Sequence, residues 1–148
     1  METPRLPPLL KAMRALQSVL DEYDVANSVR AGLGRSDWRC LEYLVENGEA
    51  RPGSIQQALG LTSGSVTALL DRLERRKLIV RSADRFDRRA VVVSPSEAAV
   101  GLLTAGLEPL AHVTEKLCDR IGEERSAVQA RQLADCVRLV EWAGARQA

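Results

Sequence analysis

The segment from Pro52 to Val93 decides the fold, and it reads PGSIQQALGLTSGSVTALLDRLERRKLIVRSADRFDRRAVVV. Pro52 has the fixed φ that suits the first turn of a short helix, and the turn Gly60–Leu61 ends that helix. Thr62 and Ser63 offer side-chain oxygens to the free amides at the start of a longer helix. The apolar residues of this longer helix recur at i, i+3, i+4 and i+7, and they are Val66, Leu69, Leu70 and Leu73. The pattern predicts two helices joined by a tight turn.

A hairpin is predicted directly after the second of these helices. The apolar run Leu78–Val80 and the run Ala90–Val93 flank a polar loop, Ser82–Arg89, which carries four charges at its tip. Helix, turn, helix and hairpin in this order are typical of a winged helix-turn-helix, a fold that places its second helix in the major groove of duplex DNA. We therefore expect a mainly α fold with one β-hairpin wing.

Periodic apolar residues place two further helices before this segment. The first helix has one stripe, which consists of Leu9, Met13, Leu16, Leu20 and Tyr23. Gly32 and Gly34 are expected to end it, and Ser36 or Asp37 to cap a second helix that Gly48 ends. The inward-facing residues of the second helix and of the short third helix are predicted to be Leu41, Leu44, Val45, Ile55, Ala58 and Leu59.

Two long helices are predicted after the hairpin. Ser94 and Glu97 stand in capping-box spacing with Pro95 at the first helical position, so the fifth helix is expected to begin there. Gly122 is expected to separate it from the sixth helix. The apolar residues of this pair are Val100, Leu103, Leu107, Leu110, Val113, Leu117, Val128, Leu133, Val137 and Val140.

The terminal helices are predicted to form a homodimer. The winged segment already uses its own helices for a core, so the stripes of the first, fifth and sixth helices are left to be covered. The predicted regions are an N-terminal dimerisation helix at 1–34, a winged helix-turn-helix at 35–94 and C-terminal dimerisation helices at 95–148, within one structural domain. The alternative is that these stripes form the core of a monomer.

Composition bounds the class of protein. The 148 residues carry a net charge of +1, but the segment from Leu61 to Val93 has eight basic and four acidic residues, so positive charge is concentrated there. No apolar run has the length of a membrane span or signal peptide, and three widely spaced cysteines do not make a disulfide framework. We predict a cytoplasmic protein without membrane partners.

The residues resemble the MarR family of bacterial transcriptional regulators, through the block LGLTSGSVTALLDRLERRKLIVR at Leu59–Arg81 and through Asp87-Arg88-Arg89 before an apolar strand. The chain departs from the family pattern at Gln56, where a small alanine is usual, and at Lys77, where a helix-ending glycine is common. It also has Val93-Ser94 where the family tends to show Leu-Thr. The resemblance implies a DNA-binding regulator, most often a repressor, that binds a pseudo-palindromic operator in double-stranded DNA as a homodimer.

Candidate DNA-binding residues fall into three groups. Short side chains near the start of the second helix of the motif are predicted to read base edges, and they are Ser63, Ser65, Thr67 and Ala68. Thr62, which caps this helix, is a further DNA-binding candidate. Arg72 and Arg75 are expected to meet phosphates. Arg85, Arg88 and Arg89 are expected to enter a minor groove, with Asp87 steering a neighbouring arginine. The alternative is that these residues form an ordinary solvated surface, with the wing arginines interleaved with Asp84 and Asp87.

The sequence says less about the effector than about DNA binding. The resemblance implies small aromatic or phenolic acids, and the residues that can line such a site are Tyr23, Trp38, Arg39 and Tyr43, with His112 on the surface or in the pocket. Trp38 and Tyr43 are better interpreted as core residues of the second helix. An alternative is oxidant sensing by Cys40, Cys118 or Cys136, although free cysteines are more often buried small hydrophobes.

Other functions find little support in the sequence. One histidine without a cysteine or acidic cluster does not define a metal site, and no arrangement of nucleophile, acid and base indicates an enzyme. No cofactor is predicted. A further alternative is a winged fold that binds protein instead of DNA.

Overall fold

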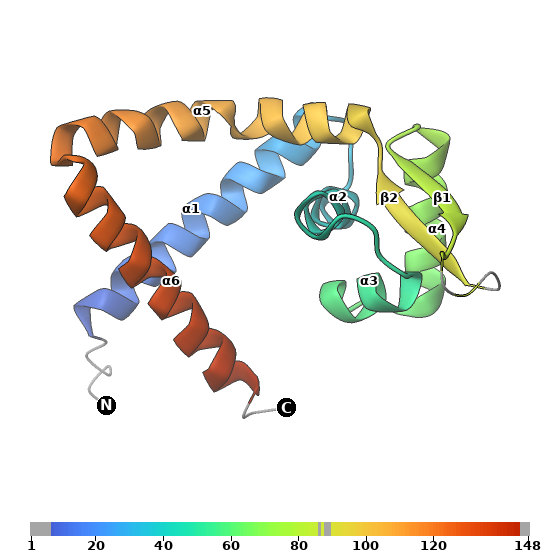
Figure 1. The fold of residues 1–148 in the computed structure, drawn as a ribbon, viewed down its shortest axis with the longest axis horizontal. Coiled ribbons are helices and arrows are strands. Elements are labelled where there is room, and N and C mark those ends of the chain that lie inside the picture. The colour runs from blue at the N-terminus through green and yellow to red at the C-terminus, as the bar shows by residue number, and fades with distance from the viewer. Residues whose placement is uncertain (1–6, 86, 88–89, 146–148) are drawn as a thin grey trace, which may run out of the picture. The chain divides into compact units, whose positions relative to one another are not determined.

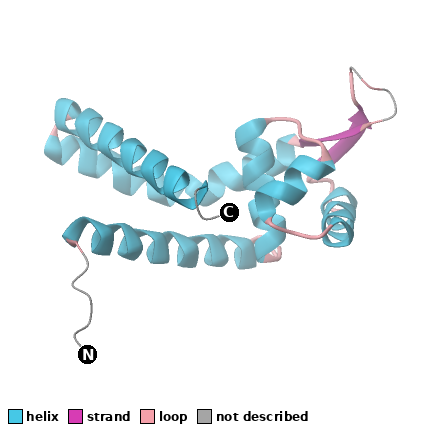
Figure 2. Cartoon of the chain, turned by 90° about the horizontal axis from the view of Figure 1, so that it is seen from below, coloured by secondary structure: helices cyan, strands magenta, loops and turns pink. Residues whose placement is uncertain are grey.

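The computed structural model describes residues 7–85, 87 and 90–145, and it confirms the winged helix-turn-helix (Figure 1). The elements are α1 (Pro8–Arg30), α2 (Arg35–Asn47), α3 (Pro52–Leu59), α4 (Ser63–Arg75), β1 (Ile79–Ala83), β2 (Val91–Pro95), α5 (Glu97–Ile121) and α6 (Glu123–Ala145). Helices dominate, and in the described residues the strands are confined to the hairpin (Figure 2). The chain forms two compact units, Met1–Gly106 and Leu107–Ala148, whose boundary lies inside α5.

The ends of α1 and α2 follow from glycine. Gly32 has a φ of +62° after α1, and its N–H donates to the carbonyl of Val29 (2.9 Å), a left-handed helix end that glycine adopts without steric cost. Gly48 ends α2 in the same φ range. The predicted caps of α2 are wrong, because the N-cap residue is Gly34 and neither Ser36 nor Asp37 caps the helix. Asp37 instead lies inside the first turn, with its carboxylate turned to another element.

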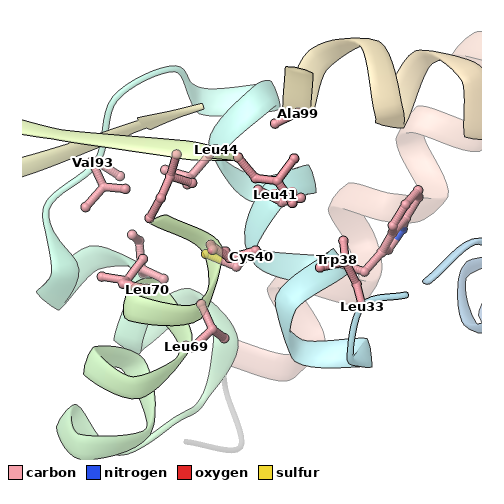
Figure 3. Packing of buried hydrophobic residues seen from close by; sticks show 14 of the residues in the cluster. Leu33, Trp38, Cys40, Leu41, Leu44, Leu69, Leu70, Val93 and Ala99 are labelled. Carbon is pink, nitrogen blue, oxygen red and sulfur yellow. The ribbon is translucent and has the colours of Figure 1, made fainter. Parts of the chain in front are cut away.

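The core of the first unit lies between α2, α3, α4 and the hairpin. Leu41 and Leu44 of α2 meet Leu69 and Leu70 of α4, and Val93 of β2 closes one side (Figure 3). All four residues of the predicted α4 face are buried, as the helical periodicity indicated. Two predicted core positions are wrong, because Val45 and Ala58 are exposed at the edges of their helical faces.

The hairpin is longer than the apolar runs suggested and is tied to the rest of the unit. Ile79 pairs with Pro95 and Ala83 with Val91, so β1 and β2 are antiparallel over five residues each. The backbone of Ala50, just before α3, also exchanges two hydrogen bonds with Val93 (2.9 and 2.8 Å). The wing is therefore attached to the α2–α3 connection and is not an isolated ribbon.

The start of α5 differs from the predicted capping box. β2 continues through Pro95, so Ser94 and Pro95 are strand residues. The side chain of Ser96 performs the capping, since its Oγ accepts the N–H of Ala99 (3.2 Å) and also donates to the carbonyl of Lys77 (2.8 Å). The sequence shows two serines before the helix, and the strand pairing decides between them.

The second unit contains the rest of α5 and all of α6, separated by Gly122 at a φ of +87° as predicted. Many of its apolar side chains are exposed within the single chain, among them Leu107, Val113, Leu117, Val128, Leu133, Val137, Leu139 and Val140. In the part of the chain that the structure describes, no helix combines the length and the apolar character that crossing a membrane requires.

Candidate nucleic-acid interface

The outer face of α4 carries the residues that were predicted to read bases. Thr62 is the N-cap, and its Oγ1 accepts the N–H of Ser65 (3.3 Å). Thr67 donates from Oγ1 to the carbonyl of Ser63 (3.0 Å). Thr62, Ser63, Ser65, Thr67 and Ala68 are all exposed. The first two turns of α4 therefore present short side chains to solvent, on a helix whose opposite face is anchored in the core.

Arg72 is held by an internal partner. Its Nη2 and Nε donate to the two carboxylate oxygens of Asp37 (2.6 and 3.3 Å), and Asp37 is buried. A bidentate pair of this kind fixes both side chains. The hydrogen bond from Arg72 to Asp37 also raises the pKa of the Arg72 guanidinium, so it stays charged. Arg72 thus joins α4 to the first turn of α2, a role that the surface pattern of α4 did not indicate.

The other arginines at the end of α4 and on β1 are also engaged. Arg75 donates from Nε to the carbonyl of Asp71 (3.2 Å) and remains exposed. Arg76 donates to the carbonyls of Ala31 (2.8 Å) and Gly32 at the end of α1. Arg81 of β1 bridges back to Asp71 (2.6 Å). Part of the positive charge counted from sequence is therefore used inside the unit.

The wing contains a buried carboxylate, although the alternative interpretation of the sequence was a solvated loop. Asp84 is only 8% exposed, and its Oδ2 accepts both Nε and Nη2 of Arg51 (2.8 and 2.6 Å). Arg85 and Asp87 are exposed, and the N–H of Asp87 donates to the Oδ1 of Asp84 (3.3 Å). The predicted minor-groove residues Arg88 and Arg89 lie outside the described residues.

A small hollow lies beside Trp38. Its volume is about 250 Å³, and it is lined by Asn27, Arg30, Ala31, Trp38, Leu102, Ala105 and Gly106. Trp38 is buried and donates from Nε1 to Glu42 (2.6 Å), while Tyr23 donates to the carbonyl of Gly106 (2.5 Å). Trp38 is therefore both a core residue and a wall of the hollow.

The remaining candidate effector residues do not line this hollow. Tyr43 packs against the core and Arg39 is exposed. His112 is an exposed residue of the second unit. Arg30 also lines the hollow, where its guanidinium donates to Oδ1 of Asn27, although the aromatic pattern used to choose candidates did not include it. Two acidic side chains nearby have altered pKa values: burial and the charge of Asp24 raise the pKa of Glu42, and burial and Asp21 raise that of Asp24.

Cys40 has no exposed surface, and burial together with Asp37 raises the pKa of its thiol to about 12. The thiolate is the reactive form of cysteine, so this environment suppresses oxidation. Cys118 and Cys136 are partly buried residues of the second unit. Within the described residues no group of three or more histidine, cysteine or acidic side chains is placed to hold a metal ion.

Three features of the site were missed from the sequence: Arg51 with Asp84, Asp37 as the partner of Arg72, and Arg76 at the end of α1. Each joins residues more than 30 positions apart. Local periodicity and capping patterns carry no information on such pairs, and the family resemblance did not supply them. For Asp84, the only indication of a structural role was its position at the end of a strand.

Comparison with known proteins agrees with this geometry. The model of the MarR family matches residues 31–90. The uncharacterized HTH-type transcriptional regulator YcgE of Bacillus subtilis is 38% identical over 93 residues, which cover 63% of this chain and 60% of the relative. The HTH-type transcriptional regulator MhqR of the same organism is 32% identical over 90 residues, covering 61% of each. The chain thus spans about three fifths of the curated relatives that it matches.

Solved structures show the same fold over most of the chain. A mutant of MepR from a multidrug resistant S. aureus clinical isolate superposes with a TM-score of 0.75 at 20% identity, covering 95% of this chain and 99% of that one. A S. aureus MepR–DNA complex gives 0.59 at 22% identity, with 86% and 96% covered. NadR in complex with 4-hydroxyphenylacetate gives 0.63 at 19% identity, with 92% and 96% covered. Residues 31–90, which contain the winged helix-turn-helix, therefore resemble the MarR family, and the solved structures share the fold of the chain.

Proposed function

We propose that this protein is a transcriptional regulator that binds double-stranded DNA through α4 and the wing. The observation that carries the proposal is the outer face of α4, where short hydroxyl and methyl side chains are exposed on a helix whose orientation is fixed. A B-form major groove admits one α-helix, and small polar side chains near its N-terminus reach base edges. The curated relatives are named as HTH-type transcriptional regulators, and MepR has been solved with DNA.

In this proposal the protein acts as a homodimeric repressor. The exposed apolar residues of α1 and of the second unit give each protomer faces that a second copy can cover. Two copies of α4 related by a two-fold axis meet half-sites about one helical turn, ~10 bp, apart. The operator is therefore expected to be pseudo-palindromic.

We further propose that a small aromatic acid is the effector and that it occupies the hollow beside Trp38. The indole of Trp38 and the side chains of Leu102 and Ala105 provide apolar contact, and the guanidinium of Arg30 can pair with a carboxylate. NadR, which has this fold, has been solved with 4-hydroxyphenylacetate. The effector would lower DNA occupancy by binding better to a conformation with altered spacing of the two α4 helices.

Selection of bound duplexes from a random pool tests the DNA-binding proposal. Affinity for the selected duplex is then measured by fluorescence anisotropy at several salt concentrations, for the wild type and for Thr67→Glu. A carboxylate on the exposed face of α4 repels phosphates and removes a base-reading side chain, so we expect at least about a tenfold loss of affinity.

Asn47→Asp is the matched control, because it adds the same charge at an exposed position at the end of α2. We expect its affinity to stay within about twofold of the wild type. No enrichment of any duplex by the wild-type protein at low salt would refute the proposed function. Equal losses in the two variants would refute the role of α4.

A further inference from the structure

The wing of this protein is held by an ion pair between a buried carboxylate, Asp84, and a half-exposed arginine, Arg51. Asp84 follows β1 directly and begins a charged loop, yet it is only 8% exposed. A carboxylate in such surroundings is stable when its oxygens accept hydrogen bonds from charged or backbone donors. The contacts of Asp84 meet this requirement, and they connect three separate parts of the first unit.

The first contact runs to the start of α3. Both Nε and Nη2 of Arg51 donate to Oδ2 of Asp84, at 2.8 and 2.6 Å. Arg51 is the N-cap residue of α3, and its neighbour Ala50 pairs with Val93 of β2 in both directions. Arg51 is therefore positioned by backbone hydrogen bonds on one side and by a helix on the other.

The second contact runs within the wing. Oδ1 of Asp84 accepts the N–H of Asp87 (3.3 Å), and the backbone N–H of Asp84 donates to the carbonyl of Ala90 (2.9 Å). The carboxylate thus determines the path of the chain directly beyond β1, where Arg85 is exposed. Oδ1 of Asp84 holds the loop in its conformation, and Oδ2 attaches the loop to the start of α3.

We propose that Arg51 and Asp84 are positioning residues for DNA binding: their ion pair orients the wing relative to α3 and α4, so that Arg85 reaches the DNA while α4 occupies the major groove. This inference rests on the proposed function and adds to it the residues that set the wing geometry. A pair tying the base of the wing to the helix preceding α4 keeps the two DNA-contacting parts in a constant relative orientation.

The direction in which one substitution changes DNA affinity distinguishes a positioning role of the ion pair from a purely electrostatic one. Asp84→Asn removes a negative charge beside the proposed interface. If the ion pair only neutralised Arg51, the released guanidinium would attract phosphates, and affinity for DNA would rise. If the pair orients the wing, affinity falls about tenfold and the slope of log K against log salt becomes shallower by about one phosphate contact, because Arg85 is no longer placed on the DNA.

The matched control is Asp21→Asn, which makes the same charge change in the Arg35–Asp21 pair, where both side chains are more than half exposed. We expect no loss of affinity there, because exposed pairs fix little. Arg51→Gln should reproduce the loss of Asp84→Asn, the double variant should be no worse than either one, and Arg51→Lys should recover part of the affinity. Arg51→Gln also serves if Asp84→Asn does not fold, since Arg51 is half-exposed.

A second double-mutant cycle reports on the wing itself. Arg85→Ala should weaken binding in the wild-type background but have little further effect in Asp84→Asn. Unchanged or increased affinity in both Asp84→Asn and Arg51→Gln, with wild-type protein binding its selected duplex normally, would overturn the inference and leave the proposed function intact. Failure of the wild type to bind any duplex would overturn both.

Discussion

A single lysine occupies a backbone conformation that favours glycine. Lys77 has a φ of 59°, and the N–H groups of Lys77 and Leu78 donate to the carbonyls of Glu74 and Leu73 at the end of α4. The same hydrogen-bonded helix end is made at Gly60, which has a φ of 65°. The left-handed conformation costs a residue with a Cβ about 1 kcal/mol relative to glycine.

Lys77→Gly should therefore stabilise the protein by about 1 kcal/mol, because the backbone hydrogen bonds remain and the strain is removed. Gly60→Ala is the mirror-image control and should destabilise by a similar amount, since space around Gly60 is open and strain alone changes. Urea denaturation measures both free energies of unfolding. A destabilised Lys77→Gly would show that the lysine side chain makes an interaction outweighing the strain.

The buried thiol of Cys40 gives a prediction for redox chemistry. With a pKa of about 12, the thiol remains almost entirely protonated at pH 7. Peroxide should accordingly leave DNA affinity unchanged in the variant Cys118→Ser/Cys136→Ser, in which Cys40 is the remaining thiol. Mass spectrometry after treatment of the native protein should find Cys40 unmodified, and its oxidation before global unfolding would contradict this.

The same thiol affects stability at high pH. Its pKa is raised in the folded state from an ordinary value of 9.0 to about 12, so the folded protein resists losing the proton. The stabilisation by the protonated thiol is complete below pH 9. It is lost as the pH rises from 9 towards about 12, by about 1.4 kcal/mol per pH unit. Cys40→Ala should be less stable at pH 8 because of its cavity, but its stability should fall less steeply between pH 9 and 11.

At the scale of whole elements, the sequence predicted much of the first unit. The Val66 to Leu73 repeat, the Thr62 cap and the glycine turns are local patterns, and each is present in the structure. The predictions were wrong at helix starts where contacts with a segment distant in the sequence determine the local structure. Asp37 was predicted to cap α2 but pairs with Arg72, and Ser94 was predicted to cap α5 but belongs to β2 because that strand pairs through Pro95.

Contacts between α2 and α4 allow the effect of the hollow on DNA binding to be tested without an effector. Trp38 lines the hollow, and its neighbour Asp37 binds Arg72 of α4. Arg76, which directly follows α4, binds the carbonyl of Ala31, which also lines the hollow. Ala105→Phe would fill the hollow and press on the Trp38 wall. We expect DNA affinity to fall about fivefold or more as α4 shifts, because packed interiors transmit displacement.

Thr104→Phe is the control for this experiment, since residue 104 is exposed on the same helix and does not line the hollow. Fluorescence anisotropy with the selected duplex compares the two variants. In an Asp37→Asn background the effect of Ala105→Phe should shrink. Equal affinities for the variants at 104 and 105 would contradict a connection between the hollow and α4.

At the scale of the molecule, the apolar surface of the second unit predicts assembly. Leu117 is 46% exposed and Val113 63% exposed in the single chain, on a face that a monomer would leave in water. Leu117→Lys should leave the fold of the protomer intact and weaken the homodimer at least about tenfold, because a charge would have to be buried in the interface. Sedimentation velocity over a range of concentrations measures the change.

His112→Lys adds the same charge at an exposed polar position of the same helix and should leave the dimer intact. A wild-type protein that is monomeric at micromolar concentration would contradict the prediction. The sequence leads to the proposal of a dimer because apolar stripes indicate faces that a monomer would leave uncovered. The arrangement of the partner was not accessible from the sequence, because it depends on contacts with another chain.

Ser96 is the only residue between the end of β2 and the start of α5, and its hydroxyl bonds both to α5 and to the carbonyl of Lys77, in the turn that follows α4. Because one residue connects the two elements, they cannot turn independently. A rotation of the beginning of α5 therefore tilts the hairpin. Inserting two glycines after Ser96 would therefore let the two parts turn independently. Binding strength in such a variant would become insensitive to changes made along α5, even where each part retains its native structure.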